Sequence, residues 1–286
     1  MGFGLSGMRD ANVMYALGTV KLARDAFAEA EAHCNDAIAA GRDDAWVYYV
    51  RGRALYRLDR EAEAEADYDA ALARGMDSAE LHYWRGSARA WQWKHDQALQ
   101  DFDLAAENGM ADDAQLRVLR GRALLRLHQS QRALDDFDRA IELNRDDAVL
   151  RTLRGEALLQ LGQRAEAGQD FARALATTPD HAGALRWAAE VELGEARFAE
   201  ARAHLDRLVA LMPSNGEALA TRGVARYAQG DIEGAGNDFA AGLELEPQDI
   251  SIPCRIALVL LRHGWVDAAA EQLEARYSRL LKSVEV

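Results

Sequence analysis

The chain has 286 residues, a formal net charge of −13 and 49% hydrophobic residues. The negative charge argues against duplex DNA and anionic membranes as partners, because both require a basic surface. The two cysteines, Cys34 and Cys254, form no CxxC pair, and neither a secretory signal nor a membrane-length apolar run is visible. We therefore expect a cytoplasmic protein.

The dominant pattern is a repeat of small residues. An alanine recurs eight times at a spacing of 34 residues, with one interval of 35, at Ala30, Ala64, Ala98, Ala133, Ala167, Ala201, Ala235 and Ala269. Twelve residues before each alanine lies another small residue: Gly18, Gly52, Gly86, Gly121, Gly155, Ala189, Gly223 and Ala257. Two small residues at a fixed offset mark the contact between two helices of a hairpin. The pattern predicts an all-α solenoid of eight antiparallel helix hairpins.

The predicted units follow one another along the chain after a flexible leader at residues 1–10. They lie near residues 11–44, 45–78, 79–113, 114–147, 148–181, 182–215, 216–249 and 250–286. In the clearest unit, residues 153–162 predict a first helix ended by Gly162, and residues 165–177 predict a second. The interval of 35 places an extra residue in the turn at 108–113. We expect residues 11–286 to form a single domain.

A large residue completes the repeat. Four residues after each alanine stand Cys34, Tyr68, Phe102, Phe137, Phe171, Leu205, Phe239 and Leu273. With the small residues, this pattern resembles the tetratricopeptide repeat family over roughly residues 11–280. The resemblance implies a right-handed superhelix in which the first helix of each hairpin lines a concave groove. It also implies a non-catalytic adaptor or scaffold for protein–protein interaction.

Arginine and aspartate occur together in five of the eight units. Arg51, Arg85, Arg120, Arg154 and Arg222 precede the small residue, and Asp67, Asp101, Asp136, Asp170 and Asp238 follow sixteen residues later. The other three units lack both residues. This joint occurrence predicts an ion pair between the two helices of one hairpin. A row of five anion sites is the weaker interpretation, because each arginine already has a partner.

Aromatic and arginine residues gather at the positions that the resemblance assigns to the groove of the first four units. The candidate peptide-binding residues are Tyr15, Trp46, Tyr49, Arg53, Tyr56, Arg57, Tyr83, Trp91, Arg122 and Arg126. Such residue types dominate binding hot spots, so we expect a protein or peptide partner with acidic and apolar side chains. The alternative is that the aromatic side chains pack between adjacent first helices. Stacking on single-stranded nucleic acid is less favoured, because the patch contains no lysine.

Signals for other functions are weak. The seven histidines form no HExxH motif and no metal-ligand spacing, so we expect no cofactor, no metal and no enzyme activity. The lysine and asparagine clamp by which some members of the family hold chaperone C-termini is missing. A final helix, expected near residues 266–283, carries Leu273, Tyr277, Leu280 and Leu281 and lies in the segment 266–286. Those residues suggest an alternative function, a scaffold that self-assembles into a homo-oligomer.

Overall fold

The computed structural model describes residues 3–245, with side chains from residue 10, together with residues 257, 261, 264–268, 270, 271 and 274. Throughout this described part the regular elements are helices, which confirms the all-α prediction. None of the described helices combines the length and the hydropathy that a bilayer span requires. The chain divides into two compact units, Met1–Asp146 and Asp147–Val286.

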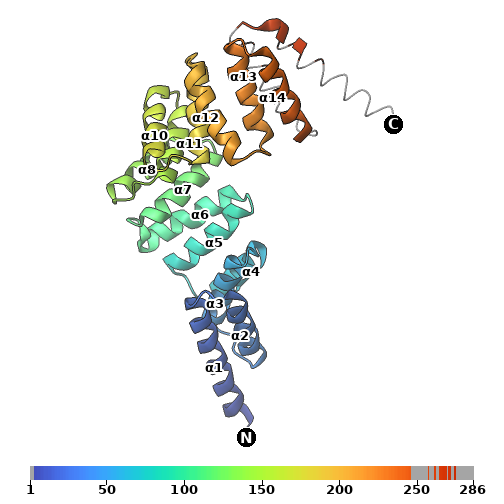
Figure 1. Cartoon of the computed structure of the whole chain (residues 1–286). Coiled ribbons are helices and arrows are strands. Elements are labelled where there is room, and N and C mark those ends of the chain that lie inside the picture. The colour runs from blue at the N-terminus through green and yellow to red at the C-terminus, as the bar shows by residue number, and fades with distance from the viewer. Residues whose placement is uncertain are drawn as a thin grey trace. The chain divides into compact units, whose positions relative to one another are not determined.

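The first unit contains four helix hairpins (Figure 1). They pair α1 (Phe3–Ala23) with α2 (Phe27–Ala39), α3 (Ala45–Arg57) with α4 (Glu61–Ala73), α5 (Ala79–Trp91) with α6 (His95–Ala105), and α7 (Ala114–Arg126) with α8 (Ser130–Glu142). Each first helix also contacts the first helix of the next hairpin, so α1, α3, α5 and α7 lie side by side. We call the surface that they form the first-helix face.

The second unit contains three described hairpins. They pair α9 (Ala148–Gln160) with α10 (Arg164–Thr177), α11 (Ala182–Gly194) with α12 (Phe198–Leu211), and α13 (Gly216–Ala228) with α14 (Ile232–Leu245). Most of the predicted eighth hairpin lies outside the described residues, including Leu273, Tyr277, Leu280 and Leu281, on which the self-assembly hypothesis depends. The single continuous domain and the homo-oligomer therefore stay predictions.

The two helices of a hairpin begin in different ways. The first helices from α3 onward start at a residue whose side chain accepts a backbone hydrogen bond, as Asp44, Ser78 and Asp113 do in the first unit. The second helices have no such cap in α2, α4, α6, α8, α10 and α12. Instead, the turn before each second helix holds a residue with positive φ: Asp25, Asp59, Trp93, His128, Gly162, Ala196, Gly230 and Gly264. This left-handed residue ends the first helix and starts the reversal of the chain.

Close contact between a glycine of the first helix and a large side chain of the second helix holds six of the seven described hairpins together, and Ala189 takes the place of the glycine in the hairpin of α11 and α12. A Cβ atom added to Gly121 would lie 2.4 Å from Cε1 of Phe137, and one added to Gly155 would lie 2.4 Å from Cε1 of Phe171. Both rings are fully buried. In the first hairpin Cys34 takes the place of the ring, and its burial raises the pKa of the thiol to about 12. The predicted small-to-large contact between the two helices is thus confirmed.

The extra residue in the third repeat lies in the turn between α6 and α7. The segment η1 (Ala106–Met110) follows α6 directly, and Gly109 within it has a non-helical φ of 118°. Gly109 lies 34 residues after Gly75, which also has positive φ, whereas α7 begins 35 residues after α5. The insertion therefore falls after Gly109, within residues 110–113, as the sequence predicts.

All five predicted arginine–aspartate pairs are present. In the fourth hairpin, Nε of Arg120 donates to Oδ2 of Asp136 at 2.7 Å, and its Nη2 donates to Oδ1 at 2.6 Å. The other four pairs join Arg51 to Asp67, Arg85 to Asp101, Arg154 to Asp170 and Arg222 to Asp238. The aspartates are almost fully buried. Hydrogen bonding to Asp136 raises the pKa of the Arg120 guanidinium.

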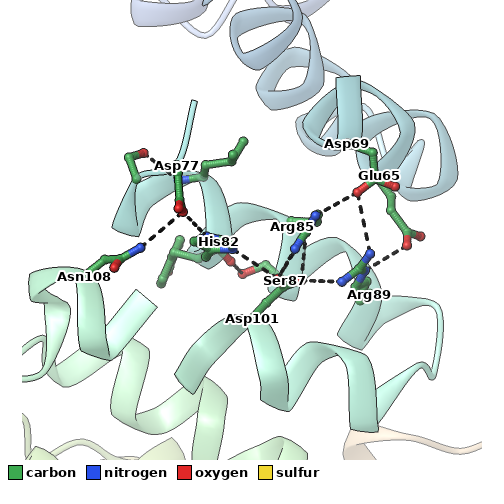
Figure 2. A network of polar contacts seen from close by, with 12 residues as sticks. Glu65, Asp69, Asp77, His82, Arg85, Ser87, Arg89, Asp101 and Asn108 are labelled. Atoms are coloured by element: carbon green, nitrogen blue, oxygen red, sulfur yellow. Dashed lines mark hydrogen bonds and ion pairs between the residues drawn. The ribbon is translucent and has the colours of Figure 1, made fainter. Parts of the chain in front are cut away.

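The same arginines also connect neighbouring hairpins. The remaining nitrogen of Arg120 donates to Asp103 on α6 at 3.0 Å, so one guanidinium joins the second helices of two successive repeats. Equivalent bonds run from Arg51 to Asn35, from Arg85 to Asp69 and from Arg222 to Asp206. Figure 2 shows the network around Asp101, which accepts from Arg85 and Arg89 and also lies 3.3 Å from Nδ1 of His82. We call this set of bonds the arginine ladder.

The glycine contact can be tested by adding one methyl group. We expect Gly121→Ala to lower the free energy of unfolding by about 1–3 kcal/mol, because the methyl group overlaps the Phe137 ring. Gly236 in α14 has no atom within 4 Å of its added Cβ, so Gly236→Ala is the control and should stabilise its helix by about 0.5–1 kcal/mol. Urea unfolding followed by circular dichroism measures both. Equal effects of the two substitutions would contradict the contact.

The arginine ladder can be tested at two adjacent aspartates. Asp136 accepts from Arg117 and Arg120, so Asp136→Ala leaves two guanidinium groups without their carboxylate. We expect a loss of about 3–5 kcal/mol in the free energy of unfolding. Asp135 is exposed and, within the described part of the chain, accepts a hydrogen bond only from Gln131, so Asp135→Ala should change stability by about 0.5 kcal/mol or less. Similar losses in both variants would refute the ladder as a source of stability.

Candidate functional site

Aromatic and arginine side chains form a continuous strip across α3 and α5 on the first-helix face. Trp46 packs edge-on against Tyr49 with 6.1 Å between ring centroids, and Tyr56 packs against Trp84 at 5.6 Å. The guanidinium carbon of Arg53 lies 4.6 Å from the centroid of the Trp84 ring. Arg53 is therefore held by cation–π contact within the protein.

A hollow of about 290 Å³ opens where α3, α5 and α7 meet the turn into α6. Four of the predicted residues line it: Tyr56, Trp91, Arg122 and Arg126. Trp93 and His95 also line it, together with the smaller or apolar residues Ser87, Ala90, Leu119 and Ala123. We call this hollow the tryptophan pocket.

The aromatic wall of the tryptophan pocket is oriented by one hydrogen bond. Nε1 of Trp91 donates to the hydroxyl of Tyr56 at 3.0 Å, across the interface between α5 and α3. Burial raises the pKa of the Tyr56 phenol, so the hydroxyl stays protonated at neutral pH. Trp91 is nevertheless 63% exposed. Its indole is thus fixed at one edge and open to a ligand on its ring surface.

The pocket combines positive charge with an unpaired histidine. Arg122 and Arg126 lie one turn apart on α7 and are both exposed. Arg122 makes no hydrogen bond or ion pair with any residue that the structure describes. Both ring nitrogens of His95 are buried without a hydrogen-bond partner in that part of the chain. Burial and the nearby Arg126 cation lower the pKa of His95, so its ring is neutral at pH 7.

Two predicted residues lie nearer the first hairpin. The guanidinium of Arg42 lies 3.7 Å from the centroid of the Tyr15 ring. Arg57 reaches the Phe27 ring at 4.4 Å and Asp25 at 3.6 Å. The structure therefore does not bring Tyr15 and Arg57 to the tryptophan pocket.

Tyr49 and Tyr83 are packed between helices. Tyr49 lies 6.3 Å from the buried ring of Tyr68, and Tyr83 packs against the buried cluster that contains Phe102 and Leu116. Burial raises the pKa of Tyr49, and it raises the pKa of Tyr83 to about 12. The cluster against which Tyr83 packs includes Leu116 and Ala123 of the neighbouring first helix α7, whereas the Tyr68 ring beside Tyr49 belongs to the second helix α4.

Sequence reasoning missed three residues of this surface: Trp84, Trp93 and His95. The family pattern assigns the groove to positions on first helices, whereas Trp93 lies in the turn and His95 is the first residue of α6. Trp84 is on α5, but it lies two residues before Gly86, at a position that the pattern does not assign to the groove. A usable signal was present, because three of the six tryptophans fall within residues 84–93. In the described part of the chain, no group of three or more His, Cys, Asp or Glu side chains is arranged to hold a metal ion.

Comparison with solved structures shows the same architecture. The chain is similar to a tetratricopeptide repeat protein from Parabacteroides merdae, with 17% identity, a TM-score of 0.66 and coverage of 88% of this chain and 99% of that one. It is also similar to the C-terminal part of a repeat protein from Cytophaga hutchinsonii, with 14% identity, a TM-score of 0.60 and coverage of 83% and 97%. A third similar structure is YrrB, with 17% identity, a TM-score of 0.51 and coverage of 65% and 95%.

No curated protein matches the chain in sequence. Two profiles of the tetratricopeptide repeat match it, one over residues 49–113 and 118–182 and the other over residues 158–223. Together they cover more than half of the chain, and the described helices form the consecutive hairpins of that repeat. This chain belongs to the tetratricopeptide repeat family.

Proposed function

We propose that this protein is a non-catalytic adaptor or scaffold that binds a peptide or protein segment in a concave groove on the first-helix face of the first unit. The tetratricopeptide repeat generally serves protein–protein interaction. YrrB, which shares the fold, is described as having an unusual peptide-binding site. A fold hosts many functions, so the proposal depends on the site itself.

The tryptophan pocket is the observation that carries the proposal. It places an exposed tryptophan, a tyrosine and two arginines around a hollow in a protein whose net charge is −13. Large exposed aromatic residues without a cover mark contact sites, and tryptophan, tyrosine and arginine supply most hot spots in interfaces. An apolar side chain fits the aromatic walls and a carboxylate complements the arginines. The partner segment accordingly carries acidic and apolar side chains.

The strip on α3 and α5 extends the site beyond the pocket. Trp46 is 57% exposed and lies near the start of α3, whereas Tyr56 lines the pocket near the end of that helix. A helix rises about 1.5 Å per residue, so a separation of ten positions along α3 spans roughly 15 Å. That length accommodates several residues of an extended partner chain.

Selection of peptides from a display library tests the proposal. The wild-type protein and a Trp91→Ala, Arg122→Glu double variant serve as parallel targets. Both substituted residues are exposed, so helicity should be unchanged. We expect wild type to enrich peptides with an aromatic or aliphatic residue beside aspartate or glutamate. Their dissociation constants should rise at least about tenfold in the variant, since hot-spot residues contribute 1 kcal/mol or more.

A matched control carries the same kinds of change on second helices of the same unit. Leu104 on α6 and Arg132 on α8 are both exposed, and Leu104→Ala with Arg132→Glu removes one apolar group and reverses one charge. Enriched peptides should bind this control as tightly as wild type. If the peptides bind the Trp91→Ala, Arg122→Glu variant undiminished, the first-helix face is not the binding surface.

A further inference from the structure

We infer that the tryptophan pocket binds a single aromatic side chain of the partner together with the carboxylate of a neighbouring aspartate or glutamate. The ring is held by Trp91 and Trp93, and the carboxylate is held by Arg122 and His95. This inference rests on the proposed function and deepens it, because it assigns the ligand chemistry of one subsite. It also adds Trp93 and His95 to the binding surface.

The backbone at Trp93 is the first argument. The turns of the seven described hairpins and the turn at Gly264 hold a left-handed residue at this position, and three of these eight residues are glycines, Gly162, Gly230 and Gly264. Trp93 is the bulkiest of the eight and has a φ of 61°. Its side chain is 79% exposed, and its ring contact is with His95 at 5.7 Å. A large side chain held in an unfavourable conformation with little packing points to a role in binding.

The unsatisfied nitrogens of His95 are the second argument. A buried polar group without a hydrogen-bond partner is costly, and both ring nitrogens of His95 are in this state. Because His95 lines the tryptophan pocket, a ligand in the pocket can supply the hydrogen bond that its ring nitrogens lack. A neutral imidazole donates from one nitrogen, and a carboxylate oxygen is a suitable acceptor.

Size and charge define the ligand. The volume of about 290 Å³ lies at the lower end of the range for ligand pockets, roughly 300–1,000 Å³. This volume suits one side chain and not a folded partner. Arg122 has no carboxylate partner among the described residues, unlike the five arginines of the ladder. A guanidinium of this kind binds a carboxylate through two parallel hydrogen bonds.

An internal acidic segment fits better than a chain terminus. The aromatic strip continues from the pocket along α3 toward Trp46, and rings also continue along α5 to Tyr83. A partner chain that ended in the pocket would use only one side of this surface. The carboxylate is therefore assigned to a side chain of the partner.

Binding should also be linked to a proton. His95 faces Arg122 and Arg126 of α7 and Asp96 of its own helix, and the two arginines oppose its protonation. A ligand carboxylate would offset these cations and raise the pKa of His95. Affinity for a carboxylate ligand should then increase as the pH falls through the ordinary titration range of histidine, near 6.5, while the ligand carboxylate stays ionised.

A blocked peptide tests the ligand chemistry directly. The probe is acetyl-Ser-Phe-Asp-Ser-amide, which has no terminal carboxylate, with matched peptides that carry Asn for Asp or Ala for Phe. Indole N–H signals in NMR spectra report binding at Trp91 and Trp93. We expect the Asp peptide to shift these two signals and to bind at least about fivefold more tightly than either matched peptide. Arg122→Gln should reduce the affinity of the Asp peptide to that of the Asn peptide.

Three results would overturn the inference: equal affinity of the Asp and Asn peptides, shifts confined to other tryptophans, or no shift at millimolar peptide. Each is distinguishable from failure of the proposed function. Display-selected peptides that still depend on Trp91 and Arg122 would keep the first-helix face as the binding surface without this subsite.

Trp93→Gly separates binding from structure. Glycine adopts positive φ without strain, so the variant should melt at a higher temperature than wild type. The same variant should bind the Asp peptide at least about threefold more weakly, because one wall of the pocket is gone. A lower melting temperature would make Trp93 a structural residue, and unchanged affinity would remove it from the site.

The proton linkage is tested with His95→Asn. From about pH 8 to about pH 5.5, we expect wild-type affinity for the Asp peptide to rise at least about threefold, and affinity for the Asn peptide to change little. In the His95→Asn variant the affinity should be independent of pH. A wild-type profile that is flat, or one that persists in the variant, would exclude His95 as a ligand-binding group.

Discussion

The arginine ladder is the interaction on which the rest of the structure depends. Each ladder arginine neutralises a nearly buried aspartate within its own hairpin, and four of them also reach the preceding hairpin. Burying either charge alone would be strongly unfavourable, so the two partners must meet with good geometry. Since the geometry repeats, the ladder sets the register between consecutive hairpins. That register brings α3, α5 and α7 together around the tryptophan pocket.

The hairpin of α11 and α12 shows how the fold manages without a ladder arginine. Ala188 replaces the arginine and His204 replaces the aspartate. Nδ1 of His204 lies 2.8 Å from Oε2 of Glu192, so a polar contact still joins the two helices. The acidic residue is now on the first helix and the basic residue on the second. The contact joins the same two helices, but on the first helix it starts at Glu192, one turn after the Ala188 position.

Aromatic residues serve two purposes in the first unit, and their position on the helix separates them. Tyr49 and Tyr83 lie within the spans of α3 and α5, where neighbouring helices cover them. Trp91 is the last residue of α5, and Trp93 follows in the turn. Near the end of α5, the side chains that α7 places beside these tryptophans include the charged Arg122 and Arg126, which do not bury the rings. The aromatic side chains at this end, Trp91 and Trp93, are therefore exposed and line the tryptophan pocket.

Sequence alone determined the all-α hairpin architecture and the ladder, because both depend on residues at constant offsets within one period. Gly121 and Phe137, or Arg120 and Asp136, must meet once the two helices of a hairpin are packed. Four residues that the sequence assigned to the groove, Tyr56, Trp91, Arg122 and Arg126, also line the tryptophan pocket. Only the tertiary structure decided which aromatic residues are covered, that Arg53 is held against Trp84, and that Trp93 and His95 join the site. These properties depend on how α3, α5, α7 and the turn before α6 are placed relative to one another. The spacing of residues within a single repeat carries no information on that placement.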